Sequence, residues 1–202
     1  MMRGQKSSTP GILFVCTGNI ARSPFMELTL ANRLAGTMAV GLPLSSAGTY
    51  ASTGSPVHRD VAAELRNRGI DADGFVASQL TAEKILAAGL ILTASREHRR
   101  LVARLAPQRR NATFTLRQFV RLIQLDPVGE IRLQADGPLD ALAQLANRNR
   151  GLSAGAQDDD DIADPVGSPR RAFAAAFAAI DPPIGVLADL IAGLRSLPPA
   201  QG

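Results

Sequence analysis

The chain has 202 residues, of which 46% are hydrophobic and 4% aromatic, so it can bury one sizeable core of Ala, Leu, Val and Ile, and we expect one domain. Its net charge of +4 comes from arginines spread over predicted helices without interleaved aromatic residues, which disfavours a nucleic-acid partner. One cysteine excludes an internal disulfide and, with only two histidines, a Cys/His zinc cluster, so we expect neither a metal nor a cofactor.

Residues 1–11 are polar and are interpreted as a flexible leader, because they lack the apolar segment of a signal peptide. No run of the sequence predicts a membrane span, so we expect no membrane partner. A single unpaired thiol suits a reducing compartment. These features together indicate a cytoplasmic location.

The first predicted strand, Ile12–Val15, is a short apolar run followed at once by the only cysteine, Cys16. Five residues separate Cys16 from Arg22. Ser23 and the proline after it are typical of a helix start, with serine as the cap and proline at the first helical position. We therefore predict a helix over Pro24–Leu34.

A loop that enters a helix N-terminus directs several backbone N–H groups and the positive end of the helix dipole at one point. Gly18 and Asn19 tolerate the left-handed backbone angles that fold such a loop into an anion nest. We expect a phosphate to bind there, Cys16 to rest as a thiolate in the same field, and Arg22 to hold two phosphate oxygens. The residues expected to bind phosphate are Thr17, Gly18, Asn19, Ile20, Ala21, Arg22 and Ser23.

Further predicted strands and helices alternate along the chain, which argues for parallel βαβ units. We expect an α/β three-layer sandwich with a central four-stranded parallel sheet flanked by helices. Ligands bind beyond the carboxyl ends of such strands, so Cys16 and the predicted loop Ser46–Tyr50 should line one crevice. His58 is expected to be a surface or capping residue. The remaining strands are predicted at Leu44–Ser46, Leu90–Thr93 and Thr113–Leu116, and the helices between them at Val57–Arg68, Ala82–Ala88, Arg96–Leu105 and Arg117–Gln124.

The region 125–160 is the least regular and is interpreted as an insert in a domain that spans residues 12–196. It holds a predicted helix, Leu139–Arg148, a flexible tract, Gly151–Gln157, and then Asp158–Asp161. Consecutive carboxylates point in different directions, so a metal site is not expected there. The last helical region is predicted as Ala172–Ile180 and Ile184–Leu194, broken at Asp181-Pro182-Pro183, before a tail at 197–202.

Cleavage of a phosphate ester by a thiolate needs a general acid to protonate the leaving oxygen. Asp126, Asp164 and Asp181 each precede a proline, which holds the preceding residue out of helical geometry and can aim its side chain into a pocket. Asp181 lies within an apolar helical stretch and is interpreted as a helix break. Asp126 and Asp164 remain as candidates from the residues alone.

The string Val-Cys-Thr-Gly-Asn-Ile-Ala-Arg-Ser-Pro at 15–24 resembles the signature of low-molecular-weight protein tyrosine phosphatases. The resemblance covers most of residues 12–194 apart from the insert. It implies a phosphotyrosine phosphatase that forms a phosphocysteine on Cys16, with Arg22 holding the transferred group and Asp164, just before the last helical region, as the acid. It continues through Ser46–Thr49, Gly69–Asp71, Leu90–Ala94 and Asp164-Pro165.

The resemblance also assigns supporting roles. It implies that Asn19 and Ser46 hydrogen-bond the loop into shape and that Ser23 donates to Cys16. Two departures stand out: Ala21 replaces a cysteine that many relatives carry, and Val166 stands where relatives often have tyrosine. The aromatic wall for a phosphotyrosine ring is therefore expected from Tyr50.

Three other functions stay open on the same loop. A protein arginine phosphatase resembles it but carries threonine where Ile20 stands, and an apolar Ile20 favours an aryl ester. Arsenate reduction would need an external thiol, because no second cysteine exists. A non-catalytic phosphoprotein-binding module is disfavoured because Cys16, Arg22 and Asp164 are all present. In each phosphatase case the partner is a phosphoprotein, and inorganic phosphate or a similar oxyanion should bind in the loop.

Overall fold

Four parallel strands form one sheet in the order β2-β1-β3-β4, within the residues that the computed structural model describes, 10–125, 137–153 and 160–195. Central strand β1 pairs with a neighbour on each side, so that Val15 lies between Ala47 and Thr93. This arrangement confirms the predicted four-stranded parallel sheet. The strands are β1 (Gly11–Cys16), β2 (Leu44–Gly48), β3 (Ala88–Thr93) and β4 (Thr113–Thr115).

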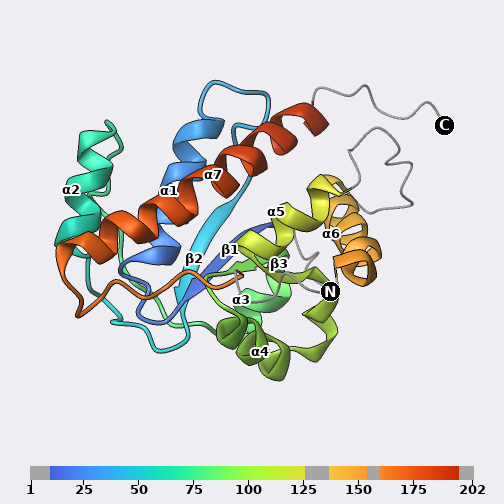
Figure 1. The fold of residues 1–202 in the computed structure, drawn as a ribbon, viewed down its shortest axis with the longest axis horizontal. Coiled ribbons are helices and arrows are strands. Elements are labelled where there is room, and N and C mark those ends of the chain that lie inside the picture. Colours follow the sequence, from blue (N-terminus) through green and yellow to red (C-terminus); the bar gives the residue numbers. More distant parts are fainter. Residues whose placement is uncertain (1–9, 126–136, 154–159, 196–202) are drawn as a thin grey trace, which may run out of the picture.

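Helices cover both faces of the sheet, as Figure 1 shows. Side chains of β1 alternate between the two faces, because successive residues of a strand point in opposite directions. Phe14 joins the core under α1 (Arg22–Leu34), α5 (Leu116–Gln124), α6 (Pro138–Arg148) and α7 (Arg170–Arg195). Val15 joins the core under α3 (Ala82–Ala87) and α4 (Arg96–Leu105). The other elements are α2 (Arg59–Asn67), η1 (Pro107–Ala112) and η3 (Asn149–Ser153).

Most element boundaries differ from the sequence prediction by one or two residues, and those of α1, β2 and β4 lie closest to the predicted loops. Helix α1 begins at Arg22 with Ala21 at the cap position, so Ser23 is not the cap. Strand β2 continues to Gly48, because its last residue pairs with Cys16. Strand β4 ends at Thr115, whose hydroxyl caps α5.

The predicted insert lies partly outside the described residues. Helix α6 begins one residue before its predicted start and buries Leu139, Leu142 and Leu145. Residues 126–136 and 154–159 lie outside the described ranges, as do residues 1–9 of the predicted leader and the tail at 196–202. Gly11, which was assigned to the leader, is the first residue of β1.

Helix α7 is continuous, so the predicted break at Asp181-Pro182-Pro183 is wrong (Figure 1). Proline removes backbone hydrogen bonds and crowds the preceding turn. Buried Ile180 and Ile184 pack into the core on either side of the prolines, and Asp181 accepts from both terminal nitrogens of Arg68 at 2.6 and 2.8 Å. Tertiary packing therefore holds the helix together across the prolines.

Residues 170–193 of α7 are also long and apolar enough to cross a membrane by length and composition, which the sequence analysis did not predict. A core helix of a globular domain has the same properties. Phe173, Ile180 and Leu187 of α7 are each at most 3% exposed. These three side chains pack into the core, while 39% of the apolar window as a whole is buried.

Candidate active site

The loop between β1 and α1 directs its carbonyl groups to one side and its backbone N–H groups to the other. Four of its carbonyl groups accept hydrogen bonds of 2.7 to 2.9 Å from the segment that follows β2. No peptide of the described chain is cis, and in a trans peptide the N–H points away from the carbonyl. The donor and acceptor pairs are Thr49 to Cys16, Tyr50 to Thr17, Ser52 to Gly18 and His58 to Ile20, which leaves the N–H groups of Thr17, Gly18, Asn19 and Ala21 on the opposite side of the loop.

Asn19 shapes this loop through its backbone and its side chain. Its φ of 55° is the left-handed value that the sequence predicted, whereas Gly18 does not adopt positive φ. Its fully buried amide donates to Ser23 Oγ at 2.9 Å and to Ser46 Oγ at 2.8 Å, and accepts from the Ser78 N–H at 2.8 Å. The side chain thus ties the loop to α1, to β2 and to the segment before α3.

Cys16 ends β1 at the base of the loop and is 2% exposed. Its sulfur lies 2.9 Å from Ser23 Oγ. Because Ser23 Oγ already accepts from Asn19, its hydroxyl proton is free to be donated to the sulfur, an arrangement that stabilises a thiolate. The first turn of α1 has no side-chain cap, so its N–H groups can also serve an anion.

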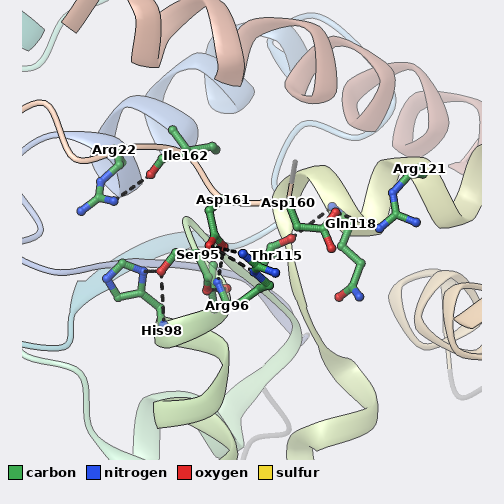
Figure 2. Close-up of polar contacts among 11 residues, drawn as sticks. Arg22, Ser95, Arg96, His98, Thr115, Gln118, Arg121, Asp160, Asp161 and Ile162 are labelled. Carbon is green, nitrogen blue, oxygen red and sulfur yellow. Dashed lines mark hydrogen bonds and ion pairs between the residues drawn. The ribbon is translucent and has the colours of Figure 1, made fainter. Parts of the chain in front are cut away.

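Arg22 is 5% exposed and is held on one edge by the loop before α7. Its Nη1 donates to the Ile162 carbonyl at 2.9 Å, as Figure 2 shows. Its Nη2 donates to Thr17 Oγ1 at 3.1 Å and forms an ion pair with Asp164. Its buried Nε has no hydrogen-bond partner among the described residues, so this donor remains for a ligand.

The segment that carries Asp164 is fixed by two arginines. Asp160 is 2% exposed and accepts from Arg121 at 2.8 Å, and Asp161 accepts from the backbone and side chain of Arg96 at 2.6 and 3.1 Å (Figure 2). The Ile162 N–H continues this attachment by donating to the carbonyl that follows β3. These contacts place Asp164, which is 41% exposed, beside Arg22.

His98 was not predicted to belong to the site. It lies on α4, is 6% exposed, and places Nε2 3.0 Å from Thr17 Oγ1 and Nδ1 2.7 Å from Ser95 Oγ. Burial, followed by the nearby charge of Arg22, lowers the pKa of His98 from 6.5 to about 4. The sequence does suggest that Ser95 caps a helix three residues before His98. It gives no sign of the contact between His98 and Thr17, because that contact spans 81 positions and has no local pattern.

Four other residues were considered for the site from the sequence: Tyr50, Asp126, Asp181 and His58. The ring of Tyr50 is 84% exposed, so its role as a pocket wall stays a prediction. Asp181 is bound by Arg68 and is not available as an acid, whereas Asp126 lies outside the described residues. His58 caps α2 as expected, through Nδ1. In the described ranges no group of three or more His, Cys, Asp or Glu side chains could hold a metal ion.

The family model described as low molecular weight phosphotyrosine protein phosphatase matches residues 11–128. A protein-arginine-phosphatase of Geobacillus stearothermophilus is 37% identical over 109 residues, which cover 54% of this chain and 70% of that protein. The low molecular weight protein-tyrosine-phosphatase Etp of Escherichia coli K12 is 36% identical over a stretch of the same length and coverage. The solved structure of the YwlE arginine phosphatase from Geobacillus stearothermophilus aligns with a TM-score of 0.64 and 30% identity, covering 90% of this chain and 92% of that one.

Proposed function

Because the chain belongs to the low molecular weight phosphotyrosine protein phosphatase family, whose members are cysteine-dependent enzymes, we propose that Cys16, Arg22 and Asp164 are its catalytic residues and that it hydrolyses phosphotyrosine in proteins. The observation that carries this proposal is the loop between β1 and α1, whose N–H groups face away from the segment that binds its carbonyl groups. Its N–H groups, an unpaired Nε of Arg22 and the sulfur of Cys16 belong to one short segment. A dianionic phosphoryl group complements that set of donors.

In the first step the Cys16 thiolate attacks phosphorus, and the bond between phosphorus and the ester oxygen breaks. Loop N–H groups and Arg22 hold the three equatorial oxygens, on which charge spreads in the transition state. The substrate displaces Asp164 from Arg22, and Asp164, protonated from solvent in this complex, gives its proton to the leaving oxygen. The products of this step are the free alcohol or phenol and a phosphocysteine.

In the second step water attacks the same phosphorus and the bond to sulfur breaks. Asp164, now a carboxylate, takes the proton of that water. The Ser23 hydroxyl, 2.9 Å from the sulfur, stabilises the departing thiolate. Inorganic phosphate leaves, and every group returns to its starting protonation state.

Phosphoarginine is the second candidate substrate, favoured by the similarity to an arginine phosphatase in sequence and in structure. Ile20 is the position that distinguishes the two readings. Its side chain lies beside Gly18 and carries only carbon atoms, so it offers no hydrogen bond to a guanidinium group. This apolar surface favours an aryl ester, and we retain phosphotyrosine as the first choice.

The test is turnover of para-nitrophenyl phosphate by the wild type and by Cys16→Ser. We expect the variant to lose turnover and to keep its affinity for inorganic phosphate, measured by calorimetry. Absence of turnover in the wild type, or its survival in Cys16→Ser, would contradict the proposal. Because Cys16 is 2% exposed, we also expect alkylation by iodoacetate to be slow and to be slowed further by phosphate.

We further propose that the protein works in the cytoplasm, since its only cysteine must stay reduced to act as a nucleophile. Cell fractionation would test this. Recovery of the protein mainly from the membrane fraction or from outside the cell would contradict it.

A further inference from the structure

We propose that His98 is a positioning residue for the loop between β1 and α1. It fixes the Arg22 guanidinium through the hydroxyl group of Thr17. This inference rests on the proposed function, because it assigns Arg22 to the phosphoryl oxygens. His98 itself does not contact the reacting atoms. It acts from α4, the helix that follows β3, on a loop that follows β1.

The three residues form a continuous hydrogen-bonded chain. Arg22 Nη2 donates to Thr17 Oγ1 at 3.1 Å, and Thr17 Oγ1 lies 3.0 Å from His98 Nε2. The far nitrogen of the imidazole, Nδ1, lies 2.7 Å from Ser95 Oγ, and Ser95 caps the same helix. Both ring nitrogens are therefore engaged, so the imidazole cannot rotate without losing a partner.

The position of His98 in this series of hydrogen bonds determines where the Thr17 lone pairs point. A threonine hydroxyl rotates freely unless a partner fixes it. With His98 Nε2 on one side, Thr17 presents a lone pair to Arg22 in a fixed direction. Without it, the hydroxyl could instead turn its proton toward Arg22, which cannot accept a hydrogen bond.

Arg22 needs this support because its other contact at Nη2 is with Asp164. In the proposed mechanism Asp164 must serve the leaving oxygen, so it cannot also hold the guanidinium throughout the reaction. Thr17 and the Ile162 carbonyl then remain as the contacts that orient Arg22. A small displacement of such a group lowers the rate strongly, by up to about a hundredfold for about 1 Å.

The charge state of His98 agrees with this role. The charged groups that act on it are Arg22 on α1 and Asp164 and Asp161 in the loop before α7. Burial and Arg22 outweigh the two carboxylates and lower its pKa to about 4. The imidazole is therefore neutral at physiological pH, and it adds no positive charge beside the guanidinium.

The experiment is a double-mutant cycle with His98→Leu, Thr17→Val and the double variant. It uses kcat/KM on para-nitrophenyl phosphate and the inhibition constant of inorganic phosphate. We expect each single variant to lose about tenfold in kcat/KM and to bind phosphate more weakly, and the double variant to lose no more than either single one. Losses that multiply, or an unchanged phosphate constant, would overturn the proposal.

Conservative variants separate positioning from packing. Gln can place a nitrogen or oxygen near the position of Nε2, so His98→Gln should recover most of the activity that His98→Leu loses, while recovery no better than His98→Leu would count against the proposal. If His98→Leu does not fold, Thr17→Ser and Thr17→Val test the same bond. Arg100→Gln, an exposed position on the same helix, is the control for changes to α4.

Failure of this inference can be told from failure of the proposed function. If the wild type hydrolyses para-nitrophenyl phosphate and all His98 and Thr17 variants match it, only the positioning role is wrong. If the wild type does not turn over, the proposed function is wrong. The affinity for inorganic phosphate across the variants then still decides whether His98 acts on Arg22.

Discussion

Arg22 at the start of α1 and Asp164 in the loop before α7 form a direct ion pair across 142 positions of sequence. The pair brings together Arg22, which is proposed to hold the phosphoryl oxygens, and Asp164, the proposed acid. The carboxylate occupies a donor of Arg22 that would otherwise be open to a phosphoryl oxygen. A substrate therefore has to compete with Asp164 for the guanidinium before the acid can turn to the leaving group.

This competition makes Asp164→Ala informative. We expect kcat to fall by about 10² to 10³, the usual contribution of general acid catalysis, with the larger loss for esters of poor leaving groups. Inorganic phosphate should bind as tightly as in the wild type or more tightly, because the competing carboxylate is gone. The measurement is kcat across a series of aryl phosphates, together with phosphate affinity. An unchanged dependence on the leaving group would shift the assignment to Asp126.

Asn19 allows backbone and side-chain effects to be separated. Asn19→Gly keeps a residue suited to a φ of 55° but removes three buried hydrogen bonds, whereas Asn19→Ala also strains the backbone. We expect both variants to lose about 3 kcal/mol of unfolding free energy from the hydrogen bonds, with Asn19→Ala losing about 1 kcal/mol more. Urea denaturation measures the difference. Equal stability of the two variants would show that the loop relaxes out of the left-handed conformation.

Ile20 gives a prediction about substrate choice. Replacing it with threonine introduces a hydroxyl beside Gly18, where Ile20 now places carbon atoms. We expect Ile20→Thr to raise the ratio of phosphoarginine to phosphotyrosine turnover by about tenfold, since a site with a hydrogen-bonding group discriminates more strongly than an apolar one. Matched peptides that carry either modification provide the measurement, with Ile20→Val as the apolar control. A ratio that moves equally in both variants would show that side-chain size, not the hydroxyl, sets the preference.

The parts of the site that the sequence predicted are local. Cys16, the loop and the helix after it lie within one strand–loop–helix unit. The strand pattern, the residue spacing and the residue types were therefore sufficient to predict that unit. The alternation of strands and helices likewise predicted the parallel sheet. Even there the residue pattern assigned Ser23 as the cap of α1, whereas only the family resemblance implied the contact of its hydroxyl with the Cys16 sulfur that the structure has.

The contacts that the sequence did not predict connect distant segments. Asp160 and Asp161 were predicted only as part of a run of aspartates after a flexible tract, but each is held by an arginine from α5 or α4. The role of His98 depends on a contact with Thr17 across the sheet edge. The two prolines of α7 indicated a break, yet core packing and Arg68 keep the helix continuous. Pairings of this kind depend on the tertiary fold and leave no periodic signal.

The two hydrogen bonds from the Arg68 guanidinium to the Asp181 carboxylate should stabilise α7 at its prolines. The Nη atoms of Arg68 lie 2.6 and 2.8 Å from the carboxylate, and these bonds are the main reason why the pKa of Arg68 is raised. The guanidinium also lies over the Phe25 ring, 4.9 Å from its centroid. We expect Asp181→Ala to lower the unfolding free energy by about 1–2 kcal/mol, less in high salt, because the pair is partly exposed. Arg66→Ala, an exposed position in the last turn of α2, which Arg68 caps, is the control. A loss no larger than that of the control would mean that the prolines are held by apolar packing alone.

The buried imidazole of His98 makes stability depend on pH. Its pKa is about 4 in the folded protein and near 6.5 in the unfolded chain, so between these values the unfolded state binds more protons. Folding stability should therefore be complete above about pH 6.5 and decrease as the pH falls toward 4, with this residue contributing up to about 3 kcal/mol. Urea denaturation of the wild type and of His98→Gln across this range isolates the contribution, because the carboxylates are common to both proteins. The two stability curves should converge as the pH falls. Curves that stay parallel would show that His98 takes up its proton in the folded protein as it does in the unfolded chain. In that case the neutral state of His98 would not govern its contact with Thr17.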